Sequence, residues 1–164
     1  MSQPDLSQRT ILVTGATSGI GKEIVSLLAS AGADLIITGR NADVLDSLCK
    51  SFPDRIAKVL PCDLRNEEEI IALVEDCPVL NGFVHSAGIA PQMPLQFIKP
   101  AQLAEVFQVN FFSAFNIVRG LLSKKKLAKG ASLVFLSSQA TQLPLMGGTM
   151  YVSSKAALEG FARN

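Results

Sequence analysis

The sequence predicts an α/β fold, in which helices cover both faces of a parallel sheet. Three observations carry this prediction. Short apolar, β-prone runs alternate with segments of helical periodicity along the chain. The run Leu80–His85 is nearly all apolar, as expected for a central strand that is buried on both faces. A glycine-rich turn joins the first apolar run to the first helical segment, which is typical of a doubly wound sheet.

The first half of the chain divides into three strand–helix pairs. Gly32 ends the first helix, because glycine readily adopts the left-handed conformation found at helix C-termini. Asn41 and Asn66 precede the second and third helices, where their side chains can accept hydrogen bonds from the first turn. The expected strands are Thr10–Thr14, Asp34–Thr38 and Ile56–Pro61. The expected helices are Gly19–Ser30, Ala42–Ser51 and Asn66–Glu75.

The second half begins with the strand Leu80–His85 and a loop that contains prolines. Pro100 suits the first position of a helix, because its missing N–H group would have no partner there. We expect one long helix over Pro100–Leu127, with apolar residues around most of its circumference, which indicates burial on more than one side. One side can face the sheet, and the other a partner subunit or a further part of the protein. We then expect a strand at Ser132–Leu136 and a last helix that begins at Thr149.

Length and charge indicate a single domain that does not bind nucleic acid. The chain has 164 residues, 48% of them hydrophobic, and a net charge of +1. Domains that bind nucleic acid usually carry a basic face instead. The basic cluster Lys124–Lys126, with Lys129 nearby, fits the solvated end of a helix.

The cysteines and the N-terminal segment predict a cytoplasmic protein. Cys49, Cys62 and Cys77 are odd in number and lack the spacing of metal ligands. We therefore interpret them as reduced thiols and expect no metal site. The segment before Arg9 is polar and lacks the apolar stretch of a signal peptide. No apolar run in the sequence is long enough to cross a bilayer.

The glycine-rich turn is the first candidate functional feature. Gly15, Gly19 and Gly21 follow the first strand with the spacing G-x3-G-x-G and lead directly into a helix. Glycines let the backbone approach phosphate groups, and the N-terminus of a helix favours an anion. The arrangement therefore predicts a Rossmann-type site for a dinucleotide pyrophosphate. The alternative is an ordinary turn between a strand and a helix.

Ser138, Tyr151 and Lys155 form the second candidate feature, with the spacing Ser-x12-Tyr-x3-Lys. Residues four apart share one face of a helix, so Lys155 is expected to lie near Tyr151. A neighbouring ammonium favours the phenolate form of a tyrosine, which lets the phenol exchange a proton with an alcohol or ketone. A serine hydroxyl can hold the same substrate oxygen. The pattern therefore predicts proton transfer to or from a carbonyl oxygen.

Together these two features resemble the short-chain dehydrogenase/reductase family. The resemblance rests on Thr14-Gly15-x3-Gly19-Ile20-Gly21, followed in order by Ser138, Tyr151 and Lys155. It runs from about Arg9 to the end of the chain and implies a nicotinamide dinucleotide as the cofactor. The catalytic residues that it implies are Asn110, Ser138, Tyr151 and Lys155. The predicted cofactor-binding residues, which include Arg40 because of its charge, are Gly15, Thr17, Ser18, Gly19, Ile20, Gly21, Arg40, Asp63, Leu64, Ala87, Gly88, Tyr151 and Lys155.

The resemblance also implies a role for each of these side chains. Tyr151 gives a proton to the carbonyl oxygen, and Ser138 orients that oxygen, with Ser137 as a neighbouring alternative. Lys155 favours the phenolate and binds the nicotinamide ribose. Asn110 anchors a water that links the lysine to solvent. For Asp63, which follows the third strand, the family resemblance implies a contact with the adenine.

His85 and Ser86 depart from the family motif, in which two asparagines precede Ala87-Gly88. The amides of those asparagines make hydrogen bonds beneath the cofactor. Histidine and serine can both bond to backbone groups, so we expect them to replace these hydrogen bonds locally. For His85 we expect a structural role rather than that of a metal ligand or a base.

Family members continue beyond the helix that carries Tyr151, with two more strands and a substrate-binding loop. We therefore expect residues 1–164 to form a single NAD(P)-binding Rossmann-type domain that lacks the C-terminal strands of the family. In that family the helices that begin at Pro100 and Thr149 pack against another subunit. The resemblance thus implies a homodimer or homotetramer.

Arg40 favours NADP(H) over NAD(H) as the cofactor. Folds specific for NAD place an acidic side chain at the end of the second strand, whereas an arginine there suits the 2′-phosphate. The strand Asp34–Thr38 is followed by Gly39-Arg40, without an acid. Arginine can bind such a phosphate with two hydrogen bonds. The alternative is a surface ion pair between Arg40 and Asp43.

The sequence therefore predicts an NADP(H)-dependent reductase that converts a ketone to a secondary alcohol by hydride transfer. A 3-oxoacyl thioester is the first substrate to test, because the pattern resembles the acyl-carrier-protein reductases of this family. Sugars, steroids and small diketones stay open as substrates. The alternative function is a catalytically silent dinucleotide-binding module, a sensor or a scaffold, which the altered His85-Ser86 motif favours.

Overall fold

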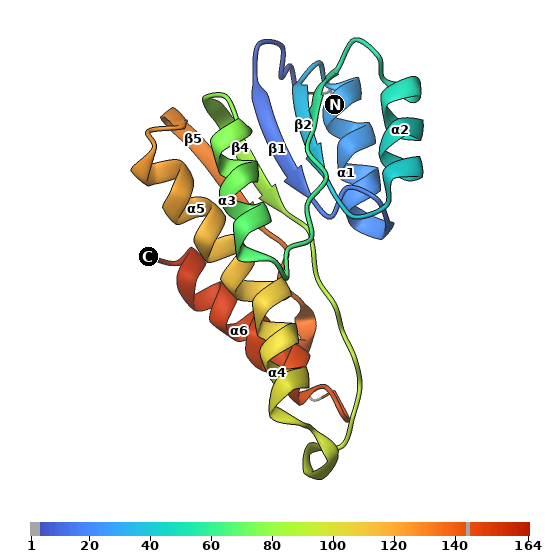
Figure 1. The fold of residues 1–164 in the computed structure, drawn as a ribbon, viewed down its shortest axis with the longest axis vertical. Helices are drawn as coiled ribbons and strands as arrows, with labels where there is room; N and C mark the ends of the chain where they lie inside the picture. Colours follow the sequence, from blue (N-terminus) through green and yellow to red (C-terminus); the bar gives the residue numbers. More distant parts are fainter. Residues whose placement is uncertain (1–3, 144) are drawn as a thin grey trace.

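A computed structural model of the chain describes residues 4–143 and 145–164. These residues form a parallel sheet with the strand order β3-β2-β1-β4-β5 (Figure 1). The strands are β1 (Thr10–Thr14), β2 (Asp34–Thr38), β3 (Ile56–Val59), β4 (Leu80–His85) and β5 (Leu127–Phe135). The chain leaves β1 toward one edge of the sheet and returns to its other side through β4. The predicted doubly wound α/β fold is confirmed.

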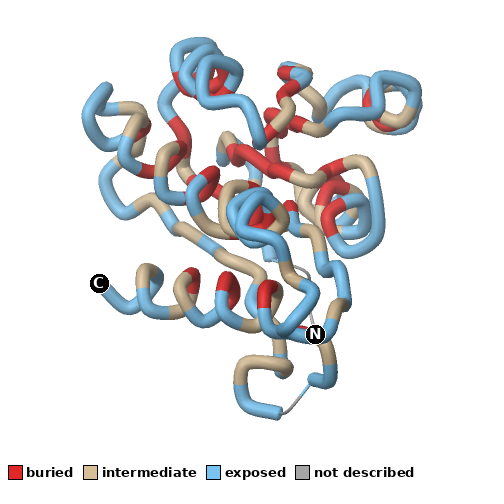
Figure 2. The backbone as a smooth tube through the Cα atoms, turned by 60° about the horizontal axis from the view of Figure 1, so that its bottom comes forward, coloured by how far each residue is buried: buried red, intermediate tan, exposed pale blue. Residues whose placement is uncertain are grey.

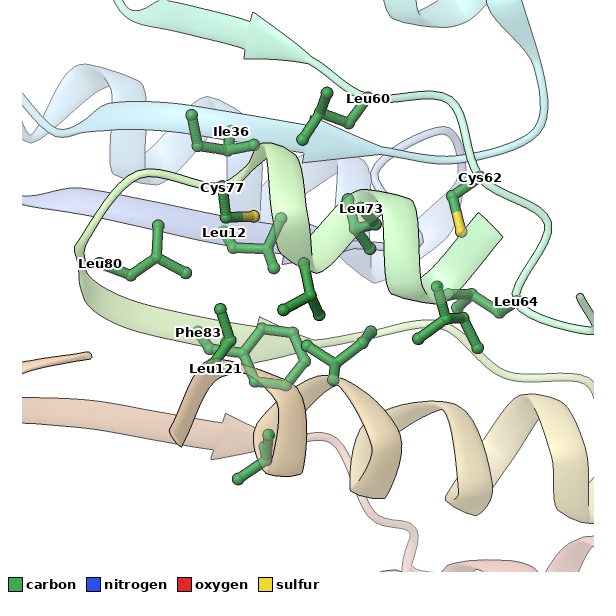
Figure 3. Close-up of a cluster of buried hydrophobic side chains, with 14 of the residues drawn as sticks. Leu12, Ile36, Leu60, Cys62, Leu64, Leu73, Cys77, Leu80, Phe83 and Leu121 are labelled. Carbon is green, nitrogen blue, oxygen red and sulfur yellow. The ribbon is translucent and has the colours of Figure 1, made fainter. Parts of the chain in front are cut away.

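Helices cover both faces of this sheet. They are α1 (Gly19–Ser30), α2 (Ala42–Ser51), α3 (Glu67–Asp76), α4 (Pro100–Phe107), α5 (Ser113–Ser123) and α6 (Thr149–Ala162). Val25 of α1 and Leu45 of α2 pack into the hydrophobic core on one face. Leu73 of α3 and Leu121 of α5 pack into the core on the other face (Figure 3). The sheet is thus the middle of three layers.

The strands contribute to both cores, because successive side chains point to opposite faces of a sheet. Leu12 and Ile36 lie in the core beside α3 and α5, together with Phe83 of β4 (Figure 3). Val13 and Ile37, one position further along, lie in the core beside α1 and α2. Burial on both faces explains why these strands are apolar at consecutive positions rather than at alternate ones.

The long helix predicted over Pro100–Leu127 is wrong in its interior. The π-helical turn Gln108–Phe112 separates α4 from α5. The side chain of Asn110, in this turn, bonds to both the N–H and the C=O group of Ile89. These tertiary hydrogen bonds accompany the widened turn and outweigh the preference of the sequence for a regular helix.

The C-terminal boundary of that predicted helix is also wrong. α5 ends at Ser123, and Lys125 adopts a left-handed conformation with a φ of 54°. The ammonium of Lys126 then donates to backbone carbonyl groups at the end of α3. β5 begins at Leu127 rather than at Ser132, because Leu127 already pairs with Leu80 of β4.

The remaining boundaries differ from prediction by one or two residues. β3 ends at Val59, two residues before Pro61, whose ring nitrogen carries no hydrogen to donate to a neighbouring strand. Asn66 is the N-cap of α3, as predicted, and its Oδ1 accepts from the N–H groups of Glu68 and Glu69, whereas the helix itself spans Glu67–Asp76. β5 ends at Phe135, one residue before the predicted end.

α6 begins at Thr149 as predicted and lies along one side of the molecule, with buried residues on a single face (Figure 2). Its buried residues are Met150, Ser154, Lys155 and Leu158. Residues 1–3 of the polar N-terminal segment lie outside the described part of the chain. Within the described part, no helix combines the length and the apolar character needed to cross a membrane.

Candidate active site

The glycine-rich turn lies where the strand order reverses, between the carboxyl ends of β1 and β4. Gly15 has a φ of 69°, and a Cβ atom there would lie 2.7 Å from the backbone nitrogen of Ala87. A Cβ atom on Gly21 would lie 2.1 Å from the carbonyl oxygen of Gly15. The turn, the first residues of α1 and the loop after β4 therefore pack backbone against backbone. Crevices at such a position of an open α/β sheet are where ligands bind.

A cavity of about 330 Å³ opens at this point. Every residue predicted to bind the cofactor lines it except Gly21, which packs against the backbone of Gly15. Ser18 is the N-cap residue of α1, yet its side chain makes no capping hydrogen bond. The first N–H groups of a helix lack intrahelical partners, so this end of the cavity offers donors and a positive dipole end to an anion.

The far end of the cavity is lined by Tyr151 and Lys155. The Lys155 ammonium lies 5.9 Å from the centre of the Tyr151 ring, and it donates a hydrogen bond of 2.7 Å to the carbonyl oxygen of Leu136. Burial lowers the pKa of Lys155 to about 8, because removal from water disfavours its charged form. A cation that is buried beside a phenol is well placed to act on the charge of that phenol.

Asn110 is fully buried in the π-helical turn behind this end of the cavity. Its Oδ1 accepts from the N–H group of Ile89 at 2.8 Å, and its Nδ2 donates to the Ile89 carbonyl and to the Ser154 hydroxyl, both at 2.9 Å. All these partners belong to the loop after β4 or to α6. The Asn110 side chain therefore joins three segments, and both hydrogens of its Nδ2 are already donated.

The two serines after β5 are arranged differently from each other. Ser137 lines the cavity, whereas Ser138 is not part of its wall. The Ser138 Oγ accepts a hydrogen bond of 3.2 Å from the N–H group of Ala140 and begins the short 3-10 helix Gln139–Thr141. The structure thus brings Tyr151 and Lys155 to the cavity wall, links Asn110 to the same helix through Ser154, and leaves Ser138 outside the residues that line the cavity.

His85 is fully buried at the end of β4. Its Nδ1 lies 3.0 Å from the Thr14 hydroxyl, and its Nε2 has no hydrogen-bond partner within residues 4–143 and 145–164. Burial, with a contribution from the Lys155 charge, lowers the pKa of His85 to about 3. The ring is therefore neutral at physiological pH. It joins β4 to β1 through the Thr14 hydroxyl, and the backbone groups of Val109 and Asn110 lie close enough to the ring to act on its pKa in the opposite direction.

Arg65 and Glu105 are two charged residues of the cavity wall that the sequence did not predict. Arg65 donates to both carboxylate oxygens of Asp63, at 3.0 and 2.6 Å, and to Glu105 of α4 at 3.2 Å. The Arg65 hydrogen bonds hold the pKa of Asp63 below its ordinary value. The Asp63 carboxylate predicted to face the adenine is thus engaged by Arg65. Local sequence gives no signal for the contact with Glu105, because α4 follows forty residues later.

Arg40 lies on the same wall as Asp63 and Arg65. Among the ion pairs of the described residues none includes Arg40, so the alternative pair with Asp43 is not formed. The guanidinium of Arg65, in contrast, has two carboxylate partners. Of these two arginines, only Arg40 lines the cavity without a salt bridge to a carboxylate of the described residues.

Comparison with known proteins agrees with this geometry. Residues 9–164 match the family model described as short chain dehydrogenase. The L-xylulose reductase of Caenorhabditis elegans is 37% identical, over 97% of this chain and 65% of the relative. The 3-oxoacyl-[acyl-carrier-protein] reductase FabG of Rickettsia prowazekii is 31% identical, over 98% of this chain and 66% of the relative.

Solved structures give the same result. A short chain dehydrogenase from Escherichia coli CFT073, complexed with NADPH, superposes with a TM-score of 0.85 and 31% identity. The match covers 98% of this chain and 71% of that structure. The chain spans about two thirds of the length of the curated relatives it matches. With a family model that covers nearly all of its residues, this chain belongs to the short-chain dehydrogenase/reductase family.

Proposed function

We propose that the whole protein is an NADP(H)-dependent reductase that converts a ketone to a secondary alcohol. One observation carries the proposal: a single cavity has a glycine-rich helix N-terminus at one end and the Tyr151–Lys155 pair at the other. This lining suits a dinucleotide whose pyrophosphate lies at the helix and whose reactive ring lies beside the phenol. Membership of an oxidoreductase family supports the same reaction class.

The residues of the cavity fit NADPH. The close backbone packing at Gly15 and Gly21 leaves no room for a side chain, and it holds the glycine-rich turn against the start of α1 and the loop after β4. The N-terminus of α1 would hold the pyrophosphate, Arg40 the 2′-phosphate, and Lys155 the nicotinamide ribose. When bound, NADPH supplies the hydride. That a relative of this fold was solved with NADPH supports this choice of cofactor.

Tyr151 acts as the general acid in this proposal, and its hydroxyl gives a proton to the carbonyl oxygen of the substrate. The remaining phenolate is stabilised by the buried Lys155 ammonium, 5.9 Å from the ring centre. The hydrogen bond from Lys155 to the Leu136 carbonyl keeps this cation in place. Ser138 orients the carbonyl oxygen. Burial of the Lys155 side chain strengthens its effect on the phenolate charge.

Asn110 takes a different part from the water anchor that the family resemblance implies. Both hydrogens of its Nδ2 are donated, to Ile89 and Ser154, and its Oδ1 accepts from the Ile89 N–H group. We therefore infer that the Asn110 side chain fixes the π-helical turn against α6. Its partner there is Ser154, which lies three residues after Tyr151 and one before Lys155. A water that links Lys155 to solvent would then be held by other groups of the same turn.

The natural substrate is the least defined part of the proposal. A 3-oxoacyl thioester is the first compound to test, and the match to a 3-oxoacyl-[acyl-carrier-protein] reductase supports it. A small sugar ketone is the second, supported by the match to an L-xylulose reductase. We expect the protein to act in the cytoplasm as a homodimer or homotetramer. The half-exposed aromatic side chains Phe112 and Phe115 offer a surface for such an association.

The test compares Tyr151→Phe with the unchanged whole protein, following NADPH oxidation with each ketone. General acid catalysis contributes roughly 10²–10⁴-fold, so kcat should fall by about that factor. The Kd for NADPH should stay nearly constant, because the lost hydroxyl acts on the substrate oxygen. Wild-type kcat in Tyr151→Phe would refute the mechanism.

The silent-module alternative has one observation in its favour. Ser138 does not line the cavity, and its hydroxyl oxygen accepts a hydrogen bond from the Ala140 N–H group. If the whole protein binds NADPH tightly but oxidises it with no ketone, sugar or thioester, the sensor or scaffold reading replaces the reductase.

A further inference from the structure

Glu159 binds the segment that carries the catalytic serine. It lies on α6 four residues after Lys155, and its side chain is only 23% exposed. Its Oε1 accepts hydrogen bonds from the hydroxyl groups of Ser137 and Thr141, the latter at 2.8 Å. These two partners stand on either side of Ser138 in the chain. One carboxylate oxygen therefore holds the residues on both sides of Ser138.

Further hydrogen bonds connect Thr141 and Ala140 to Ser138 itself. The Thr141 hydroxyl lies 2.9 Å from the Ser138 carbonyl oxygen as well as beside Glu159, so its single proton serves two acceptors. The Thr141 N–H donates to the same carbonyl at 3.2 Å. The Ser138 hydroxyl oxygen accepts from the Ala140 N–H group. The orientation of Ser138 thus depends on the turn that Glu159 holds against α6.

The carboxylate form of Glu159 is maintained by these same contacts. Hydrogen bonds from Ser137 and Thr141 hold the pKa of Glu159 below its ordinary value. Arg163 lies on the exposed side, with its Nη2 3.6 Å from Oε2. Hydrogen bonds to an ionised acceptor are roughly twice as strong as neutral ones. The contact of Oε1 with the two hydroxyls is therefore the strong one, and the pair with Arg163 is the weak one.

We propose that Glu159 is a positioning residue, which sets the Ser138 hydroxyl for catalysis by holding Ser137 and Thr141 against α6. The proposal rests on the proposed function, since it acts through the catalytic serine. It explains why the two hydroxyl side chains around Ser138 turn toward α6 rather than toward solvent. In this proposal α6 carries Tyr151 and Lys155 and also positions Ser138 through Glu159.

The main test uses Glu159→Gln in the whole protein. Glutamine keeps the shape and one acceptor oxygen but removes the charge, so we expect kcat to fall by roughly tenfold. The Kd for NADPH should stay within about twofold, because Glu159 does not line the cavity. Arg163→Gln is the matched control, since it removes the exposed partner of the same carboxylate and should leave kcat unchanged.

A double variant separates positioning from a general structural effect. In a Ser138→Ala background there is no hydroxyl left to position, so adding Glu159→Gln should change kcat by less than about twofold. A merely structural role would lower kcat by the same factor in both backgrounds. Equal factors, or an unchanged kcat in Glu159→Gln alone, overturn the proposal.

Hydrogen exchange gives a readout that does not depend on turnover. The amides of Ala140 and Thr141 bond to Ser138, and they should exchange at least about fivefold faster in Glu159→Gln than in the unchanged protein. Unchanged exchange overturns the positioning. If the whole protein reduces no carbonyl compound, the proposed function is refuted instead. The exchange rates then test only whether Glu159 holds the turn that contains Ser138.

Discussion

The two ends of the cavity are built by different means. At the glycine-rich turn the wall is backbone, and it depends on the absence of side chains at Gly15 and Gly21. At the other end the wall depends on buried polar side chains. Asn110 is bonded to Ile89 and Ser154, and Lys155 to the carbonyl of Leu136. The first end should therefore respond to added volume, and the second to pH and to the loss of single atoms.

The largest expected effect concerns the buried cation at the end lined by Tyr151 and Lys155, called the catalytic end after its proposed role. Lys155 has a pKa of about 8 in the folded chain, against an ordinary value of 10.5. Below pH 8 the protein bears the full cost of burying the charge. Between pH 8 and 10.5 the folded state releases its proton first, so this cost is relieved as the pH rises. The relief amounts to about 3 kcal/mol at ~1.4 kcal/mol per pKa unit.

Lys155→Met removes that dependence, and the comparison should be made without cofactor. The free energy of unfolding of the unchanged protein, minus that of Lys155→Met, should rise between pH 8 and 10.5. Denaturant titrations at several pH values measure this difference, in which the titration of other groups cancels. A difference that stays flat across this range would mean that Lys155 is better solvated than its burial indicates.

The second prediction concerns the end formed by the glycine-rich turn, called the cofactor end after its proposed role. Gly21→Ala adds volume there. The new Cβ atom would lie 2.1 Å from the Gly15 carbonyl oxygen, a backbone atom that no rotamer change can move. Overpacking of this kind costs about 1–3 kcal/mol of stability. NADPH affinity should fall by roughly 10- to 100-fold, because the helix N-terminus and the turn move apart.

Gly160→Ala is the matched control for that change. A Cβ atom at Gly160, in α6, meets nothing within 4 Å. Alanine inside a helix is favoured over glycine by roughly 0.5–1 kcal/mol, so this variant should be slightly more stable than the unchanged protein. Thermal unfolding and fluorescence titration with NADPH test both variants. If Gly21→Ala bound NADPH as tightly as Gly160→Ala, the cofactor end would not depend on close backbone packing.

The contrast between the two ends also explains which features could be predicted from the sequence. The glycine turn, the caps at Asn41 and Asn66, and the start of α6 follow from local chemistry, and all of them are found in the structure. The spacing of Tyr151 and Lys155 likewise follows from one helical turn. These features are local, because the residues that determine them are neighbours in the chain.

Features of the catalytic end that depend on distant residues could not be predicted. The π-helical turn at Asn110 is tied to Ile89, twenty-one residues earlier. The contact of Glu159 with Ser137 spans twenty-two residues. No periodicity marks either contact, since each depends on how the loops after β4 and β5 meet α6. The hydrogen bond between His85 and Thr14 is likewise formed only when β1 and β4 pair.

The last prediction compares two arginines on one wall of the cavity. Arg40 has no carboxylate partner in residues 4–143 and 145–164, whereas Arg65 is paired with Asp63 and Glu105. A 2′-phosphate should therefore be recognised by Arg40. One charge-assisted contact contributes roughly 1.5–3 kcal/mol, so NADPH should bind at least ~10-fold more tightly than NADH.

Arg40→Asp should invert this preference, because the carboxylate repels the phosphate and can accept hydrogen bonds from the free ribose hydroxyls. Arg65→Gln should change the ratio of the two dissociation constants by less than about threefold, since the charge it removes is already neutralised. Fluorescence titration of the whole protein with each cofactor measures both ratios. A ratio near one in the unchanged protein would refute the assignment of Arg40. A larger loss of preference in Arg65→Gln than in Arg40→Asp would transfer the phosphate contact to Arg65, and would mean that its ion pairs open when the cofactor binds.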